Sequence, residues 1–166
     1  AVALQEITET LHVITDSNGY WWVNQGQTYE VERDDSLLWA PKLNKAGKTE
    51  FHWNNVAKLN VGYIVFHYAN EEIKAISVVS VAGQNEDAPN TIYEVPEDTE
   101  GWGARTSYHE LATPIARSSV GKRLNKHVVD YGPINKKGTA NQGYLFALND
   151  SATRVLAELV DLKSVP

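Results

Sequence analysis

The clearest structural signal in this 166-residue chain is the stretch Asn60-Val61-Gly62-Tyr63-Ile64-Val65-Phe66-His67-Tyr68. A glycine turn leads into β-branched and aromatic side chains, and this pattern predicts a strand over residues 63–68. Residues 69–72 have the composition of a hairpin turn, and the apolar run over 73–82 predicts a returning strand. The sequence therefore places an antiparallel pair of strands at the centre of the fold.

Segments before this hairpin predict two shorter strands and a helical turn. Residues 20–23, Tyr-Trp-Trp-Val, follow turn-forming residues and are typical of a strand. The apolar run 37–40 stops at Pro41, which predicts a brief strand because proline cannot donate to the hydrogen-bonded ladder of a sheet. Residues 51–59 predict a helical turn, and helically spaced apolar side chains in 1–18 indicate a leading helix or a linker.

Segments after the hairpin predict further strands and a long loop. Residues 84–101 are acidic and contain two prolines, which predicts a loop with one short strand at 91–93. Residues 102–111 alternate loosely and favour a strand, whereas the basic run 114–126 is typical of a connector. The apolar run 144–148 predicts another short strand.

Residues 149–162 predict a helix that closes the domain. Asn149-Asp150-Ser151 offers side chains that cap helix N-termini, and an apolar stripe continues to Leu162. Residues 19–162 are therefore expected to form one α+β domain, in which two or three helices flank a curved, mostly antiparallel sheet or open barrel. We interpret residues 163–166 as a linker to a possible further domain, because the chain lacks an initiating methionine and has the character of an excised domain.

The composition argues against several classes of function. The chain has no cysteine, so disulfides and thiolate metal sites are excluded, and it has no apolar segment long enough to predict a membrane span. Its five histidines lack the spacing of a helical metal site, and it contains no glycine-rich phosphate loop. We therefore expect no catalytic residue, no metal and no other cofactor, and we expect a cytoplasmic protein that contacts no membrane.

The net charge of −6 argues against non-specific binding to nucleic acid, but the charges are segregated along the chain. Residues 71–102 are strongly acidic, whereas residues 103–148 are basic. One face of the protein could therefore be basic, although a randomly solvated surface explains the same pattern. The candidates for contacts with a phosphate backbone are Lys42, Lys45, Arg105, Arg117, Lys122 and Arg123.

Five tryptophans and eight tyrosines are more than a core of this size requires. Trp39 precedes Ala40-Pro41 and Trp102 lies between two glycines, so a ligand could approach both rings at the ends of elements. Indole rings that face each other would form a slot for a planar base, and such stacking contributes about 1–3 kcal/mol per base. Trp22 and Trp53 are further candidates, and core packing is the alternative explanation for each indole.

A slot for a base also needs polar groups that recognise the edge of the base. Asn24 and Gln25 end the first predicted strand, and the central strand meets its turn at His67, Tyr68 and Asn70. Amide side chains suit this role because each carries both a donor and an acceptor. Hydrogen bonds to the backbone of the turns are the alternative role for these amides.

The order of these features resembles the EVE and YTH domains of the PUA-like superfamily. The run from Tyr20 to Gln25 resembles the opening strand of EVE domains, although Asn24-Gln25 replaces their usual Lys-Ser pair. Leu38-Trp39-Ala40 resembles the YTH strand that bears the first cage tryptophan. Residues 60–79 resemble the central EVE hairpin.

The later part of the chain extends this resemblance to residues 19–162. Glu100-Gly101-Trp102 begins a segment that resembles the strand near which YTH domains carry a second cage tryptophan. Pro114-Ile115 resembles the exit from that strand, and the helix after Asn149 also has a counterpart in these domains. The resemblance implies that Trp39 and Trp102 belong to an aromatic cage, to which Trp22, Trp53 or a tyrosine adds a third ring.

The resemblance implies a reader of a modified base and not an enzyme. In such a reader, the base flips out of the duplex and enters the cage. Our first hypothesis is a DNA-specificity module of a modification-dependent endonuclease, which reads 5-methylcytosine, 5-hydroxymethylcytosine or N6-methyladenine. A fused nuclease domain is the candidate partner. The second hypothesis is an RNA reader of N6-methyladenine. The third is a small hydrolase or a ligand-binding domain that uses the same pocket.

Overall fold

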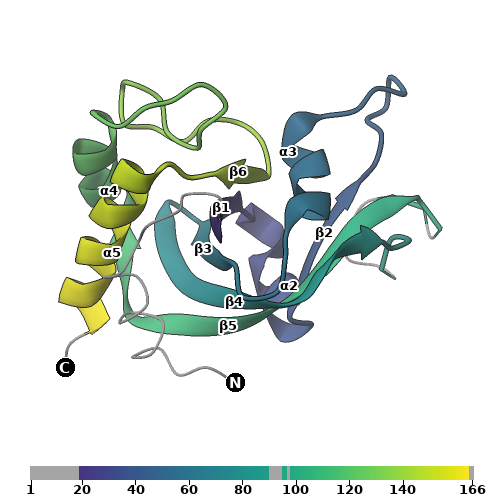
Figure 1. Ribbon diagram of the computed structural model, residues 1–166, viewed down its shortest axis with the longest axis horizontal. Helices are drawn as coiled ribbons and strands as arrows, with labels where there is room; N and C mark the ends of the chain where they lie inside the picture. The colour runs from purple at the N-terminus through teal and green to yellow at the C-terminus, as the bar shows by residue number, and fades with distance from the viewer. Residues whose placement is uncertain (1–18, 90–94, 97, 165–166) are drawn as a thin grey trace.

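A computed structural model describes residues 19–89, 95–96 and 98–164 (Figure 1). The helix or linker expected over 1–18 and the short strand expected at 91–93 lie outside the described residues. Within the described residues, strands form a single sheet and helices pack on both of its faces.

The strands of the sheet are β1 (Tyr20–Asn24), β2 (Leu37–Pro41), β3 (Ile64–Ala69), β4 (Glu72–Asn85), β5 (Gly101–Ala116) and β6 (Leu145–Ala147). Their order across the sheet is β2-β5-β4-β3-β1-β6. β1 runs parallel to β3, and the other neighbouring pairs among these strands are antiparallel. The sheet curls into a half-barrel (Figure 1), which confirms the predicted curved and mostly antiparallel sheet.

The helices are α2 (Tyr29–Asp34), α3 (Phe51–Asn54), α4 (Arg117–Leu124) and α5 (Asp150–Ser164), with 3-10 turns η2 (Gly26–Thr28) and η3 (Asn55–Lys58). The predicted helical turn over 51–59 is confirmed as α3 followed by η3. The predicted cap of the last helix is also confirmed, because Oδ1 of Asn149 accepts a hydrogen bond from the Ala152 backbone N–H at 2.8 Å. α5 continues through Ser164, two residues into the segment interpreted as a linker.

Residues 114–126, predicted as a basic connector, instead form the end of a strand and a helix. β5 extends through Pro114 to Ala116, and α4 follows at once. The pairing of β4 with β5 is interrupted between Ile73 and Ala75, so Pro114 falls where the ladder needs no N–H donor. α4 was missed because its buried side chains are few, and its interior contains Gly121, a poor helix former.

Alternate residues of β1 contribute to cores on opposite faces of the sheet, as the two-residue period of a strand requires. Trp22 packs in the larger core, which includes residues of α4 and α5. Trp21 and Val23 pack in the second core, which Val56 of η3 helps to close. η3 approaches β4 so closely that a Cβ atom at Gly83 would stand 1.9 Å from the Val56 carbonyl oxygen, so only glycine fits there.

Candidate functional site

A chain of buried polar side chains lies at the C-terminal ends of β1 and β3. Nδ1 of His67 lies 2.7 Å from Oε1 of Gln25, and its Nε2 lies 2.6 Å from the Ser77 hydroxyl. The Gln25 amide nitrogen donates to the Tyr108 hydroxyl at 2.7 Å, and this hydroxyl donates to the Leu37 carbonyl at 3.0 Å. Because Oε1 of Gln25 can only accept, Nδ1 of His67 donates and Nε2 accepts from Ser77.

Burial keeps this network uncharged. It lowers the pKa of His67 to about 3, and it raises the pKa of the Tyr108 hydroxyl. The two rings lie with their centroids 4.0 Å apart, and Ser77 receives a further hydrogen bond from Thr106 at 2.5 Å. The polar groups of Gln25 and His67 are thus used inside the protein, where they fix the position of Tyr108.

A pocket of about 380 Å³ lies next to this network, and Tyr29 connects the two. The Tyr29 ring lines the pocket and also meets the Tyr108 ring edge-on, with centroids 6.1 Å apart. Gly26 and Asn70 line the pocket where β1 and β3 end, and both have positive φ angles, of 49° and 51°. We call this cavity the Tyr29 pocket; the lining residues used below are Gly26, Tyr29, Glu30, Arg33, Asn70, Lys74 and Glu110.

Two cations and one carboxylate surround the Tyr29 ring. The Arg33 guanidinium and the Lys74 ammonium lie 5.7 and 5.8 Å from the ring centroid. Glu110 lies 3.4 Å from Arg33 and accepts a hydrogen bond from the Tyr29 hydroxyl at 3.2 Å. Burial and the charge of Glu110 raise the pKa of Tyr29. Glu30 is a second carboxylate in the lining of the pocket, so Tyr29 supplies one aromatic wall in a pocket that is otherwise mostly polar.

No known protein family and no curated protein matches this sequence. Solved structures nevertheless resemble it in three dimensions. The YTH domain of Pho92, solved in complex with m6A, has 11% sequence identity and a TM-score of 0.57, over 92% of this chain and 90% of that chain. The DUF55 domain of human thymocyte nuclear protein 1 has 10% identity and a TM-score of 0.54, over 86% and 99%.

A second YTH domain, from Zygosaccharomyces rouxii MRB1, was solved in complex with N6-methyladenosine RNA. It has 8% identity and a TM-score of 0.51, over 85% of both chains. This protein has the YTH/EVE-like fold. At such low identities the comparison establishes the arrangement of the chain and leaves the function of this YTH/EVE-like domain to be argued from its own residues.

The predicted convergence of Trp39 and Trp102 around one cavity is wrong for this YTH/EVE-like domain. In the pairing of β2 with β5, Trp102 lies opposite Ala40 and Trp39 lies opposite Gly103, so the two indoles project from opposite faces of the sheet. Trp39 is only 2% exposed, and its indole N–H donates to the Glu86 carbonyl at 2.8 Å. Trp39 is therefore a core residue.

Packing inside the protein explains the two glycines beside Trp102. A Cβ atom at Gly101 would stand 2.4 Å from the Trp39 ring, and one at Gly103 would stand 2.4 Å from the Glu86 carboxylate. Trp102 itself is partly buried, with its indole N–H 3.3 Å from the Asn54 side-chain oxygen. These glycines make room for neighbouring side chains and do not indicate that a ligand approaches the ring of Trp102.

The other predicted pocket residues separate into three groups. Trp22 is fully buried, stacks on Tyr68 with centroids 5.1 Å apart, and donates to the Asn24 side chain at 2.7 Å. Tyr68 alternates with His67 along β3, so this group belongs to the opposite face from the buried network. Trp53 packs with Trp102 against the second core. Of the predicted pocket residues, Gln25, His67 and Asn70 lie at or behind the Tyr29 pocket.

The predicted phosphate contacts have different surroundings. Arg105 pairs with Glu86 at 2.9 Å, and Arg123 pairs with Glu158. The Lys42 ammonium lies 4.5 Å from the centre of the Trp102 ring. The remaining candidates are Lys45 and Lys122, which are exposed, and Arg117, which is half-buried at the start of α4.

The site residues predicted from the sequence do not include Tyr29, Arg33, Lys74 or Tyr108. Tyr108 shares a face of β5 with Ala104 and Thr106, and this alternation was the only available signal. Across the described ranges, no three His, Cys, Asp or Glu side chains gather as a possible metal site, and no helix is long and apolar enough to cross a membrane.

Proposed function

We propose that this protein binds nucleic acid and takes one methylated base into the Tyr29 pocket, without catalysing a reaction. The observation that carries the proposal is the pocket itself. It combines an aromatic ring, the Asn70 amide, two cations and the carboxylates Glu30 and Glu110 in about 380 Å³. The Pho92 YTH domain, which has the same overall fold, was solved in complex with m6A.

In this proposal, each residue of the pocket has a separate role in recognition. A base leaves its stack at a cost of a few kcal/mol, which contacts in the pocket must offset. The Tyr29 ring supplies apolar contact, and the Asn70 amide hydrogen-bonds to the edge of the base. Arg33 exchanges its ion pairs with Asp34 and Glu110 for one neighbouring phosphate. Lys74 exchanges its ion pair with Glu72 for the other. Gln25 and His67 support the pocket from behind by holding Tyr108.

Discrimination of a methyl group cannot rest on its burial alone. Removing one methyl group from water contributes about 0.8 kcal/mol, which is roughly a fourfold change in affinity. Additional van der Waals contacts and the exclusion of water must supply the rest. We therefore expect the protein to prefer methylated over plain strands by some tens-fold.

The test compares the affinity of the chain for matched methylated and plain oligonucleotides, by fluorescence anisotropy. RNA carrying N6-methyladenosine is the first probe, because the Zygosaccharomyces rouxii neighbour was solved with such RNA. Single-stranded and duplex DNA carrying N6-methyladenine or 5-methylcytosine forms the second arm, which tests the DNA hypothesis. Equal affinity for methylated and plain strands in every arm would refute the proposal.

Asn70→Gly is the variant that assigns the preference to the Tyr29 pocket. Asn70 has a φ of 51°, which glycine adopts without strain, so the variant removes the amide and leaves the turn intact. We expect several-fold loss of the preference for methylated strands, with an unchanged or higher Tm. Asn60→Gly removes another exposed amide away from this pocket and serves as the matched control, with the preference retained.

The association with a nuclease stays a prediction about the rest of the protein. If the full-length gene encodes a nuclease domain beside this chain, cleavage by the whole protein should depend on the same base modification that the chain binds. Digestion of methylated and plain DNA by the full-length protein measures that dependence.

A further inference from the structure

A second cleft, of about 440 Å³, lies beside the edge strand β6 and is separate from the Tyr29 pocket. It is bounded by α3 and η3 on one side and by residues 129–131 on the other. We call it the Tyr131 cleft; its charged lining residues are Lys58 and Asp130, and the other lining residues used below are Phe51, Val129, Tyr131 and Asn149.

The Tyr131 cleft gathers exposed apolar side chains. Tyr131 is 75% exposed, and Phe51 and Val129 are 41% and 42% exposed. The rings of Phe51 and Tyr131 meet edge-on, with centroids 5.0 Å apart. Half of the large hydrophobic side chains that are exposed in the described ranges thus line one cleft, which is the arrangement expected of a binding surface.

Tyr131 is held in a strained conformation. Its φ is 63°, and it occupies the third position of a turn closed by the Gly132 N–H and the Val129 carbonyl at 3.2 Å. Glycine is favoured at this position when φ is positive. Other residues are disfavoured there, because their Cβ atom crowds the backbone in the left-handed conformation. Strain of this kind persists where the surrounding structure enforces it, and it often marks a functional position.

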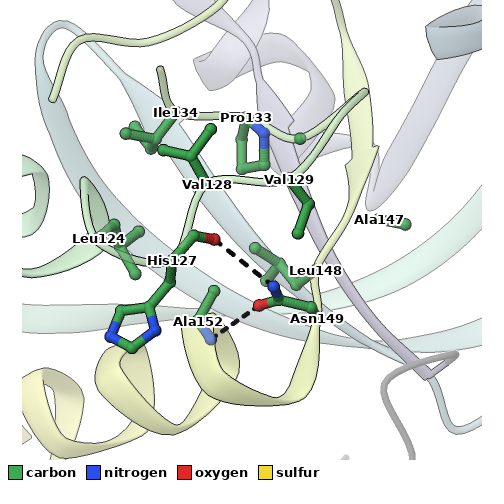
Figure 2. Close-up of a pocket in the computed structure, with 11 residues that line it drawn as sticks. Leu124, His127, Val128, Val129, Pro133, Ile134, Ala147, Leu148, Asn149 and Ala152 are labelled. Atoms are coloured by element: carbon green, nitrogen blue, oxygen red, sulfur yellow. Dashed lines mark hydrogen bonds between the residues drawn. The ribbon is translucent and has the colours of Figure 1, made fainter. Parts of the chain in front are cut away.

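The surrounding structure does enforce it (Figure 2). Val128, Pro133 and Ile134 pack against Leu124 and Leu148, and the cavity left between them is only about 10 Å³, too small for a ligand. The Asn149 side chain accepts from the Ala152 N–H at 2.8 Å and donates to the His127 carbonyl at 3.5 Å, which ties this loop to the start of α5. The residues that flank Tyr131 in this loop are therefore packed against the start of α5.

We propose that the Tyr131 cleft binds an unmodified base of the same strand, which stacks on Tyr131 against Phe51 while Lys58 contacts its phosphate. A nucleotide matches this chemistry because it joins a flat apolar ring to an anion. The cleft lies by the start of β1, where the Leu148 N–H donates to the Tyr20 carbonyl, and the Tyr29 pocket follows the end of β1. The two sites thus lie toward opposite ends of β1, and a strand bound at both would pass from one end of β1 to the other. This inference rests on the proposed binding of nucleic acid.

The experiment places the fluorescent base 2-aminopurine at successive positions on either side of the methylated base. Stacking on Tyr131 is expected to quench its fluorescence at one position, and this quenching is expected to disappear in Tyr131→Gly. The variant should bind the oligonucleotide about tenfold more weakly, which corresponds to about 1.4 kcal/mol and lies in the range for stacking of one base. Tyr131→Phe should retain both quenching and affinity.

The Tm separates this role from a structural one. Glycine relieves the strain at φ 63°, so Tyr131→Gly should melt at the same temperature as the wild type or higher. Val61→Gly removes a 66% exposed side chain that does not line the cleft, and it serves as the control for affinity. Unchanged affinity and quenching in Tyr131→Gly would overturn the inference, and so would a lower Tm with unchanged affinity.

The two proposals fail in different ways. Quenching that depends on Tyr131, without any preference for methylated strands, would reject the modified-base function and keep the second binding site. A preference for methylated strands, together with affinity and quenching that Tyr131→Gly leaves unchanged at every position, would keep the modified-base function and reject the second binding site.

Discussion

His67 has both ring nitrogens engaged in the core, and burial holds its pKa near 3. In the unfolded chain its pKa is about 6.5, so the unfolded state binds more protons between these two values. The contribution of neutral His67 to stability is complete above about pH 6.5 and is lost progressively as the pH falls toward 3. The histidine is thus a structural group that makes the fold sensitive to acid.

We expect the free energy of unfolding to fall as the pH is lowered from 7 to 4, with His67 contributing up to about 1.4 kcal/mol per pH unit. Urea titrations at several pH values measure this slope. His67→Gln should be less stable at pH 7 and should show a shallower slope. The same slope in both proteins would contradict the assignment, because the carboxylates that also titrate are common to both.

The Tyr108 hydroxyl joins the Gln25 amide to the Leu37 carbonyl. Tyr108→Phe should lower the free energy of unfolding by about 1–3 kcal/mol, because it leaves buried polar groups without a partner. Tyr63→Phe is the matched control, since its hydroxyl has only a 3.5 Å contact with the exposed Asn60, and it should be nearly neutral. Urea denaturation of both variants measures the difference.

Among the elements, α5 closes the larger core and begins beside the loop that carries Tyr131. Asn149→Ala should destabilise the protein by about 0.5–2 kcal/mol, because the cap of the helix is lost. Asn149→Asp retains the acceptor and adds a negative charge at a helix N-terminus, so it should restore most of the loss. Thermal melting of the two variants tests this, and equal destabilisation would argue against capping.

At the scale of the whole molecule, a chain of net charge −6 can bind nucleic acid only through local clusters of cations. Lys122 and Arg123 are neighbours on α4, but the guanidinium of Arg123 is already paired with Glu158. A paired cation must exchange its partner before it can contact a phosphate. Arg123 is therefore a weaker candidate for a phosphate contact than Lys122.

Lys122→Ala should weaken binding to methylated and plain strands equally, and it should reduce the slope of log affinity against log salt by about one. Arg123→Ala should change that slope less. Anisotropy titrations at several salt concentrations measure both values. If Lys122→Ala leaves the slope unchanged, this lysine makes no phosphate contact.

The candidate site could be predicted only in part, because the sequence does not show which face of each strand borders it. Adjacent residues such as His67 and Tyr68 must point to opposite sides, but the sequence does not state which side faces the pocket. Gln25, His67 and Asn70 were identified from their positions at strand ends. Tyr29 and Tyr108 come from distant segments, and their contact depends on how α2 packs against β5.

The sequence by itself determined the α+β class, the central hairpin, the short strands and the capped last helix, because periodicity, turn residues and caps act over a few neighbouring residues. Only the tertiary structure decided which aromatic rings meet. The register of β2 against β5 buries Trp39 and sends Trp102 to the other face, and a shift of one residue would reverse every side chain of that strand. Pairing between distant segments sets such a register, and no local pattern encodes it.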